Sequence, residues 1–200
     1  MTAAVTKTTT TQSAPVAAWV GARPITVAEL DRRMAVLREG PLASRLPPEG
    51  TPQGRNLRRW LVQVLTVEEL VVQQAAVYDV VCEPCDGEPE SVELAEALRA
   101  GGVTAAVLAA YPLARALRRT IVAGIDVSEH EVRAYYDRNR DRHAGAFAKE
   151  YLAIRRCLLD AARERAFGRW LDRLVAQSVR LEHGFEHPAD PRQPDADHHH

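Results

Sequence analysis

The sequence predicts an all-α protein, a bundle of about six helices with a minor two-stranded β ribbon that joins the chain ends. Three observations support this fold class. Apolar residues recur at helical spacing through most of the 200 residues. Capping-box patterns stand before two of the helical segments, at Thr26 and Ser128. Short apolar runs that suit strands occur near both ends, at residues 16–20 and 179–181.

The composition divides the chain into three parts. Residues 1–15 are rich in Thr and Ala without an apolar core, so we expect a disordered arm and no secretory signal. Residues 16–182 carry the helical pattern and form the predicted domain. Residues 183–200 are rich in Pro, Asp and His and are expected to form a tail.

Three helices are expected in the first half of the domain. Their apolar residues recur at helical spacing, and glycine or proline follows each end. The second helix must stop before Pro84, because a residue that precedes proline disfavours the α region. The expected ranges are 27–39, about 52 to before 83, and 91–99.

Three more helices and a strand follow. Pro112 lies inside the first of these helical ranges, where we expect a kink, or a restart with proline in a first turn. Residues 179–182 alternate between apolar and charged, the pattern of a half-buried strand, and the natural partner strand is residues 16–20. The expected helical ranges are 103–123, 128–139 and 147–176.

Three segments resemble the helical chaperone domain of the SurA/PrsA-type peptidyl-prolyl isomerases. They are Gly21–Leu30, which includes the Thr26 box, VSEHEVRAYYDRN at residues 127–139, and AARERAFGRWLDRL at residues 161–174. The resemblance covers residues 16–181. It implies a helical scaffold that holds peptide segments in an apolar groove.

The chain departs from that family where the parvulin isomerase domain would begin. Only a few residues separate His143 from the last helix, so we expect no prolyl isomerase activity. The relatives are mostly exported, whereas this chain has no predicted secretory signal. Its three cysteines, an odd number, suit a reducing compartment. We therefore expect a cytoplasmic protein.

Charge and hydropathy exclude two classes of partner. The formal net charge is −1, and acidic residues are interspersed with the arginines, so nothing favours nucleic acid. Of the 26 basic residues only Lys7 and Lys149 are lysines, which we attribute to coding bias. No apolar run approaches the roughly 18 residues of a spanning helix, so no membrane is expected.

Two thiols have CxxC spacing, at Cys82 and Cys85. Such a pair can share a zinc ion or cycle as a disulfide. One pair without nearby histidines is weak, because the third cysteine, Cys157, belongs to another predicted helix. A helix-ending turn with two small apolar side chains is the favoured interpretation.

The tail combines imidazoles and carboxylates, which together suit a transition metal such as Zn, Ni, Cu or Fe. The alternative is that the terminal histidines belong to a purification tag and the tail is a passive extension. A tag would leave the earlier histidines and the interleaved aspartates unexplained. The candidate ligands are His183, His187, Asp190, Asp195 and His198.

Aromatic residues on helical stripes are more often core than ligand contacts, but in a bundle some could line a groove. The candidate groove residues are Trp60, Tyr111, Tyr151 and Trp170. His130 and His143 flank another helix near several carboxylates, so an acid–base site is conceivable, although a charged helix face is the favoured interpretation.

The function that these patterns favour is non-catalytic. We expect a cytoplasmic chaperone-like or partner-binding protein that holds an apolar segment of a protein, or a small apolar ligand, in an inter-helical groove. The alternative is a metal-binding accessory protein, or a small metal-dependent or tailoring enzyme that acts on an apolar metabolite. Catalytic residues are not assigned, since the sequence contains none of the common nucleophile, nucleotide-binding or zinc-protease motifs.

Overall fold

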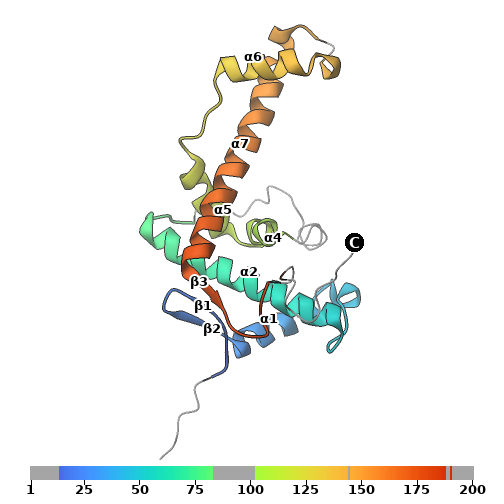
Figure 1. Cartoon of the computed structure of the whole chain (residues 1–200), viewed down its shortest axis with the longest axis vertical. Helices are drawn as coiled ribbons and strands as arrows, with labels where there is room; N and C mark the ends of the chain where they lie inside the picture. The colour runs from blue at the N-terminus through green and yellow to red at the C-terminus, as the bar shows by residue number, and fades with distance from the viewer. Residues whose placement is uncertain (1–13, 83–101, 144, 188–189, 191–200) are drawn as a thin grey trace, which may run out of the picture. The chain divides into compact units, whose positions relative to one another are not determined.

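The computed structural model describes residues 14–82, 102–143, 145–187 and 190 (Figure 1). Within these ranges it contains six α-helices and a three-stranded sheet, so the predicted all-α class with a minor sheet is confirmed. The chain forms two compact units, residues 1–62 with 180–200, and residues 63–179. Residues 1–13 of the predicted arm at 1–15, the predicted helix over 91–99 and most of the tail lie outside the described residues.

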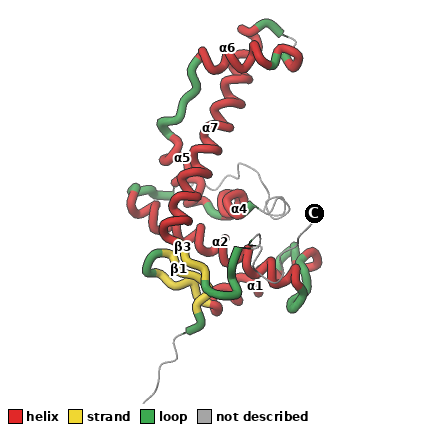
Figure 2. The backbone as a smooth tube through the Cα atoms, viewed as in Figure 1, coloured by secondary structure: helices red, strands yellow, loops and turns green. Residues whose placement is uncertain are grey.

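The sheet has the strand order β2-β1-β3, with β1 at Val16–Val20, β2 at Arg23–Thr26 and β3 at Val179–Leu181 (Figure 2). The predicted pairing of β1 with β3 is confirmed. The sequence did not predict strand β2. It pairs antiparallel with β1 as an edge strand, a place where Pro24 needs no donor.

Side chains also join the two chain ends. The Nε1 of Trp19 on β1 donates a hydrogen bond of 2.8 Å to Oε1 of Glu182, just after β3. The Arg180 guanidinium lies 5.6 Å from the centroid of the Trp19 indole. The backbone N–H of Glu182 donates to the carbonyl of Ala17 at 3.0 Å. These contacts stabilise the three-stranded sheet in addition to the ladder hydrogen bonds between its strands.

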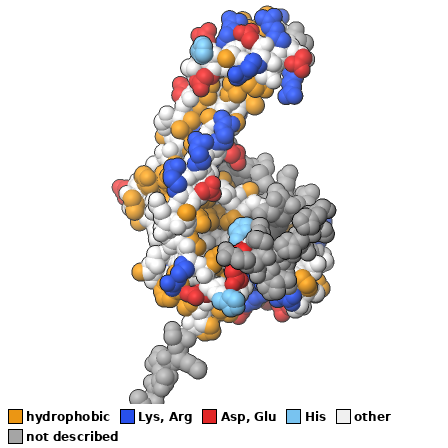
Figure 3. Space-filling model, in the orientation of Figure 1, with side chains coloured by type: hydrophobic (Ala, Val, Ile, Leu, Met, Phe, Trp, Pro, Cys, Tyr) orange, Lys and Arg blue, Asp and Glu red, His pale blue; other side chains and the backbone are white. Residues whose placement is uncertain are grey.

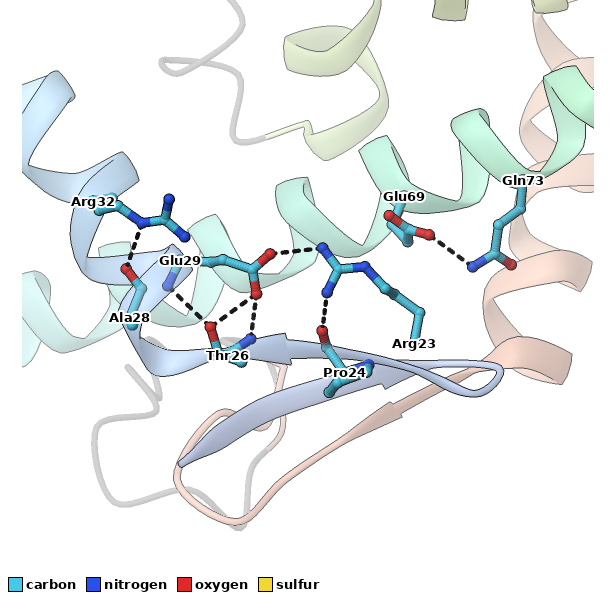
Figure 4. A network of polar contacts seen from close by, with 8 residues as sticks. All are labelled: Arg23, Pro24, Thr26, Ala28, Glu29, Arg32, Glu69 and Gln73. Atoms are coloured by element: carbon cyan, nitrogen blue, oxygen red, sulfur yellow. Dashed lines mark hydrogen bonds and ion pairs between the residues drawn. The ribbon is translucent and has the colours of Figure 1, made fainter. Parts of the chain in front are cut away.

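Helix α1 covers Val27–Glu39, the predicted range, and begins at a complete capping box (Figure 4). The Thr26 hydroxyl accepts from the Glu29 backbone N–H at 3.2 Å, and Glu29 accepts from the Thr26 backbone N–H at 2.7 Å. Arg23 on β2 donates to the other carboxylate oxygen at 2.7 Å. Partial burial raises the pKa of Glu29, but the bonds from Thr26 and Arg23 outweigh it and lower that pKa to about 2.

The change Glu29→Gln is expected to lower the free energy of unfolding by about 1 kcal/mol at pH 7, because glutamine keeps the cap geometry but loses the charge. A carboxylate with a lowered pKa stabilises the fold above its ordinary pKa of 4.5, and this contribution is lost as the pH falls toward 2. Urea unfolding at pH 7, 4 and 2.5 should therefore show the gap between wild type and variant narrowing with acid.

The control for this series is Glu39→Gln, an exposed change in the last turn of the same helix. It should cost no stability at pH 7. A gap between wild type and Glu29→Gln that stays constant with pH would contradict the role of the Glu29 charge.

Helix α2 covers Pro52–Val77 and ends earlier than the sequence indicated. Asp79 adopts a left-handed conformation with φ of 52°. The Val80 backbone N–H bonds back to the carbonyl of Ala75 at 2.8 Å, the six-to-one pattern of a Schellman ending. An aspartate tolerates the left-handed region, so the helix stops before the proline is reached.

The restart predicted at Pro112 is confirmed, since α4 covers Val103–Ala110 and α5 covers Pro112–Val122, with proline in its first turn. The predicted helices at 128–139 and 147–176 are α6, Glu129–Arg138, and α7, Phe147–Ser178. An extended connection joins α5 to α6 (Figure 2). Asp126 in this connection accepts from Arg155 of α7 at 2.7 Å.

Each unit buries aliphatic side chains almost completely. Leu30 and Leu61 in the first unit, and Leu70, Leu117 and Val132 in the second, are at most 2% exposed. Within the described ranges, no helix combines the length and the apolarity needed to cross a lipid bilayer.

Candidate functional site

The α6–α7 corner is the part of the second unit in which α6 lies across the N-terminal part of α7 (Figure 1). We define it as residues 127–162. Its core consists of four buried side chains, Val127, Val132, Tyr136 and Ile154. Ser128 starts α6 with a complete capping box, which lowers the pKa of Glu131 through hydrogen bonds from its hydroxyl and backbone N–H. The local sequence therefore fixes α6 where its apolar residues meet α7.

Two helices cannot cover all the apolar surface that this corner carries. Six more hydrophobic residues pack against the core but stay partly exposed, and Leu152 is 75% exposed. Figure 3 shows hydrophobic side chains along this stretch of α7. The partly exposed residues are Tyr135, Phe147, Tyr151, Leu158, Leu159 and Ala162.

Aromatic rings pack together at the end of the corner where the loop joins α6 to α7. The rings of Tyr136 and Phe147 meet edge to face at 5.4 Å between centroids, and those of Phe147 and Tyr151 do so at 5.6 Å. Such pairs add about 0.5–1.5 kcal/mol each beyond their burial. The Tyr136 hydroxyl donates to the carbonyl of Gly145 at 2.8 Å and ties the α6–α7 loop to the core.

Two arginines of the corner lie against this aromatic cluster. The Arg133 guanidinium is 3.6 Å from the centroid of Phe147, and that of Arg140 is 5.1 Å from the centroid of Tyr136. Arg140 also faces Asp137 at 3.7 Å. Arg133 is exposed and forms no ion pair with any carboxylate of the described residues. Its charge is therefore held beside apolar surface and stays available to an anionic group.

His143 lies between these rings, with centroids 5.9 Å from Tyr135 and 5.8 Å from Tyr136. Its Nδ1 is 3.4 Å from Oε2 of Glu150, and its Nε2 is buried without a hydrogen-bond partner among the described atoms. A general base must reach the proton that it removes. This histidine therefore suits a structural role, and His130, the other histidine considered for acid–base chemistry, is exposed on α6.

The four candidate groove residues occupy different places. Tyr151 belongs to the α6–α7 corner. Trp170 lies 19 residues further along α7, about 28 Å at 1.5 Å per residue, and stacks on Phe167 at 5.4 Å. Tyr111 joins α4 to α5, and Trp60 belongs to α2 in the first unit. A groove lined by all four stays a prediction, and only Tyr151 contributes to the surface described above.

The metal and thiol sites also stay predictions. His183 is fully exposed, and its Nδ1 pairs with Oε1 of Glu186 at 3.0 Å. Glu186 accepts from the Gly184 backbone N–H, which lowers the pKa of this carboxyl. In the part of the chain that the structure describes, no three His, Cys, Asp or Glu side chains converge as metal ligands do. Asp195, His198 and Cys85 lie outside it, while His187, Asp190, Cys82 and Cys157 lie inside.

Sequence reasoning missed two contacts of the corner. It associated His143 with the carboxylates of α6, but the partner is Glu150, in the first turn of α7. It also did not single out Arg133, whose guanidinium stacks on Phe147. Both contacts depend on how α6 crosses α7. Gly145 is the residue in the loop that relates to the first contact. It leaves room for the Glu150 carboxylate, since a Cβ atom at this position would lie 2.6 Å from Oε1 of Glu150.

Comparison with protein families finds a match near the start of the chain. Residues 16–53 match a family of unknown function, DUF7158. The match covers the β1–β2 hairpin, α1 and the loop that leads into α2. No curated protein and no solved structure matches the chain.

Proposed function

We propose that the protein is a non-catalytic, chaperone-like binding protein that holds an apolar peptide segment on the α6–α7 corner. The observation that carries this proposal is the row of partly exposed apolar side chains beside the buried core of the corner. Tyr151 and Leu158 are seven residues apart, as are Leu152 and Leu159, so each pair lies on one side of α7. An extended or helical apolar segment can bury these two neighbouring rows together.

The charge at the end of the corner favours an occupant with an acidic residue. Arg133 presents its guanidinium next to Phe147 and has no carboxylate partner among the described residues. When the apolar part of such a segment covers α7, an acidic side chain that follows it would lie next to the Arg133 guanidinium. Arginine also forms paired hydrogen bonds with carboxylates, which adds geometric selectivity.

A binding role without chemistry agrees with the state of the histidine in the corner. The Nε2 atom of His143 is buried, so a substrate does not reach it.

A reducing compartment such as the cytoplasm is part of the same proposal. It is supported by Cys157, an exposed free cysteine that would be prone to oxidation elsewhere.

The change Leu152→Asp tests the proposal. The probe is a fluorescein-labelled peptide of leucine, phenylalanine and alanine with two glutamates at one end, and the measurement is fluorescence anisotropy. Wild type should bind it saturably. Leu152→Asp should weaken binding at least tenfold, about 1.4 kcal/mol, because a charge then lies on the apolar row. Leu152 is exposed, so the fold should persist.

The matched control is Val36→Asp, the same kind of change at a side chain that is 64% exposed on α1 of the first unit. It should leave peptide binding unchanged. A second variant, Arg133→Glu, should reverse the preference between this peptide and one with lysines in place of the glutamates. Equal weakening by Leu152→Asp and Val36→Asp, or no saturable binding by wild type, would rule out the corner as the binding surface.

A further inference from the structure

A pocket of about 200 Å³ lies in the first unit, between the C-terminal half of α1, the loop before α2 and the first turns of α2. It is smaller than the pockets that take drug-sized ligands and suits a molecule of a few heavy atoms. Three of its lining residues are arginines, and one is a carboxylate. The residues that the argument uses are Met34, Arg38, Glu49, Gly54, Arg55 and Arg58.

The three guanidinium groups are held in position by the protein. Arg58 donates to Asp31 at 2.6 Å, and Arg55 donates to the carbonyl of Gly50 at 2.7 Å. Arg38 donates to the carbonyl of Pro47 at 3.2 Å. Each of these bonds fixes the place of a guanidinium, a group that carries five N–H donors. Cations positioned before a ligand arrives cost less to order when it binds.

Arg38 is incompletely satisfied. Its Nε atom lies 2.9 Å from Oε1 of Glu49, within ion-pair distance, but the N–H bond is not aligned with that oxygen. The Nε atom is buried and makes no hydrogen bond with the described residues. A buried donor without an aligned acceptor destabilises the fold, and an anion in the pocket would relieve that cost.

The start of α2 adds to the positive potential. This helix has 26 residues and no acidic side chain in its first turn, so the field of its N-terminus is not offset locally. The thioether of Met34, which is 3% exposed, supplies an apolar wall. The lining thus combines cationic donors with one apolar surface.

We propose that this pocket binds the oxyanion group of a small organic molecule, a carboxylate or a phosphate, with a short apolar portion against Met34. Planar guanidinium groups bind both kinds of oxyanion through paired hydrogen bonds. Glu49 opposes the anion, and it acts as an internal competitor for Arg38. The site is independent of peptide binding at the α6–α7 corner, since all its residues belong to the first unit.

The test is a titration of the full chain, followed by the backbone amides of Gly50 and Gly54 in ¹H–¹⁵N NMR spectra. The probes are inorganic phosphate and butyrate, each added at constant ionic strength set with sodium chloride. At least one probe should shift both amides saturably, with a millimolar dissociation constant. The probe that binds more tightly identifies the oxyanion class, and no saturable shift with either would overturn the proposal.

Three variants assign the effect to the pocket. Arg55→Gln with Arg58→Gln should weaken binding at least tenfold, because two of the three cations are removed. Glu49→Gln should tighten it several-fold, because the competing carboxylate is gone, an outcome that general damage to the fold would not produce. Arg45→Gln is the matched control, since Arg45 is exposed in the same unit and does not line the pocket. A loss with Arg45→Gln equal to that of the double variant would mean non-specific attraction and overturn the proposal.

Discussion

The change Phe167→Ala is expected to lower the free energy of unfolding of the second unit by about 3–5 kcal/mol. Phe167 is 3% exposed at the middle of α7, and its ring stacks on Trp170 with an interplanar angle of 25°. Alanine would leave a cavity against α7 and remove this aromatic pair. Urea unfolding followed by far-ultraviolet circular dichroism measures the loss, because most of the signal comes from helices.

The control for this prediction is Leu152→Ala on the same helix. Leu152 is 75% exposed, so its truncation should change the free energy of unfolding by no more than about 0.5 kcal/mol. The pair separates burial from helix propensity, since both residues become alanine, the best helix former. Similar effects at the two positions would mean that Phe167 is not part of a packed core.

The elements that the sequence predicted well are those with a local physical cause. Thr26 and Ser128 each cap a helix through their own hydroxyl, and Pro112 restarts a helix because it has no N–H to donate. The pairing of β1 with β3 was predictable for a different reason. Two short apolar runs each needed a ladder partner, and the described domain offered few alternatives.

The features that sequence reasoning missed depend on tertiary placement. Strand β2 contains Pro24, which argues against a strand unless the position at the sheet edge is known. Helix α2 ends where Asp79 adopts a left-handed conformation. The sequence pattern does not predict this conformation for an aspartate. The stacking of Arg133 on Phe147 requires the crossing of α6 over α7, and periodicity along one helix does not encode it.

The candidate sites divide in the same way, into residues that local sequence predicts and residues that only tertiary placement brings together. Tyr151 was identified as a groove residue from its helical stripe, and the structure places it on the apolar surface of the α6–α7 corner. Its neighbours Leu152 and Leu159 were not singled out, because an exposed leucine cannot be recognised from spacing alone. The arginine pocket was missed because Arg38 and Arg55 come from different helices that only the fold brings together.

Two glycine-to-alanine changes in helices are expected to change the free energy of unfolding in opposite directions. A Cβ atom at Gly54, in the first turn of α2, would lie 2.2 Å from the carbonyl oxygen of Pro48, a backbone atom that cannot rotate away. The loop before α2 must then move, so Gly54→Ala should destabilise the protein by about 1–3 kcal/mol. At Gly168 in α7 nothing lies within 4 Å of the added atom. Gly168→Ala should therefore stabilise by about 0.5–1 kcal/mol through helix propensity.

Thermal and urea unfolding of both variants measures this contrast, and the comparison is internal because the chemical change is identical. Gly54→Ala should also weaken phosphate or butyrate binding, because the displaced loop forms one wall of the arginine pocket and carries the Pro47 and Gly50 carbonyls that hold Arg38 and Arg55. Gly168→Ala should leave that binding unchanged. If Gly54→Ala were as stabilising as Gly168→Ala, the loop could not pack against α2 at this distance. The wall that holds the pocket open would then have to be formed in another way.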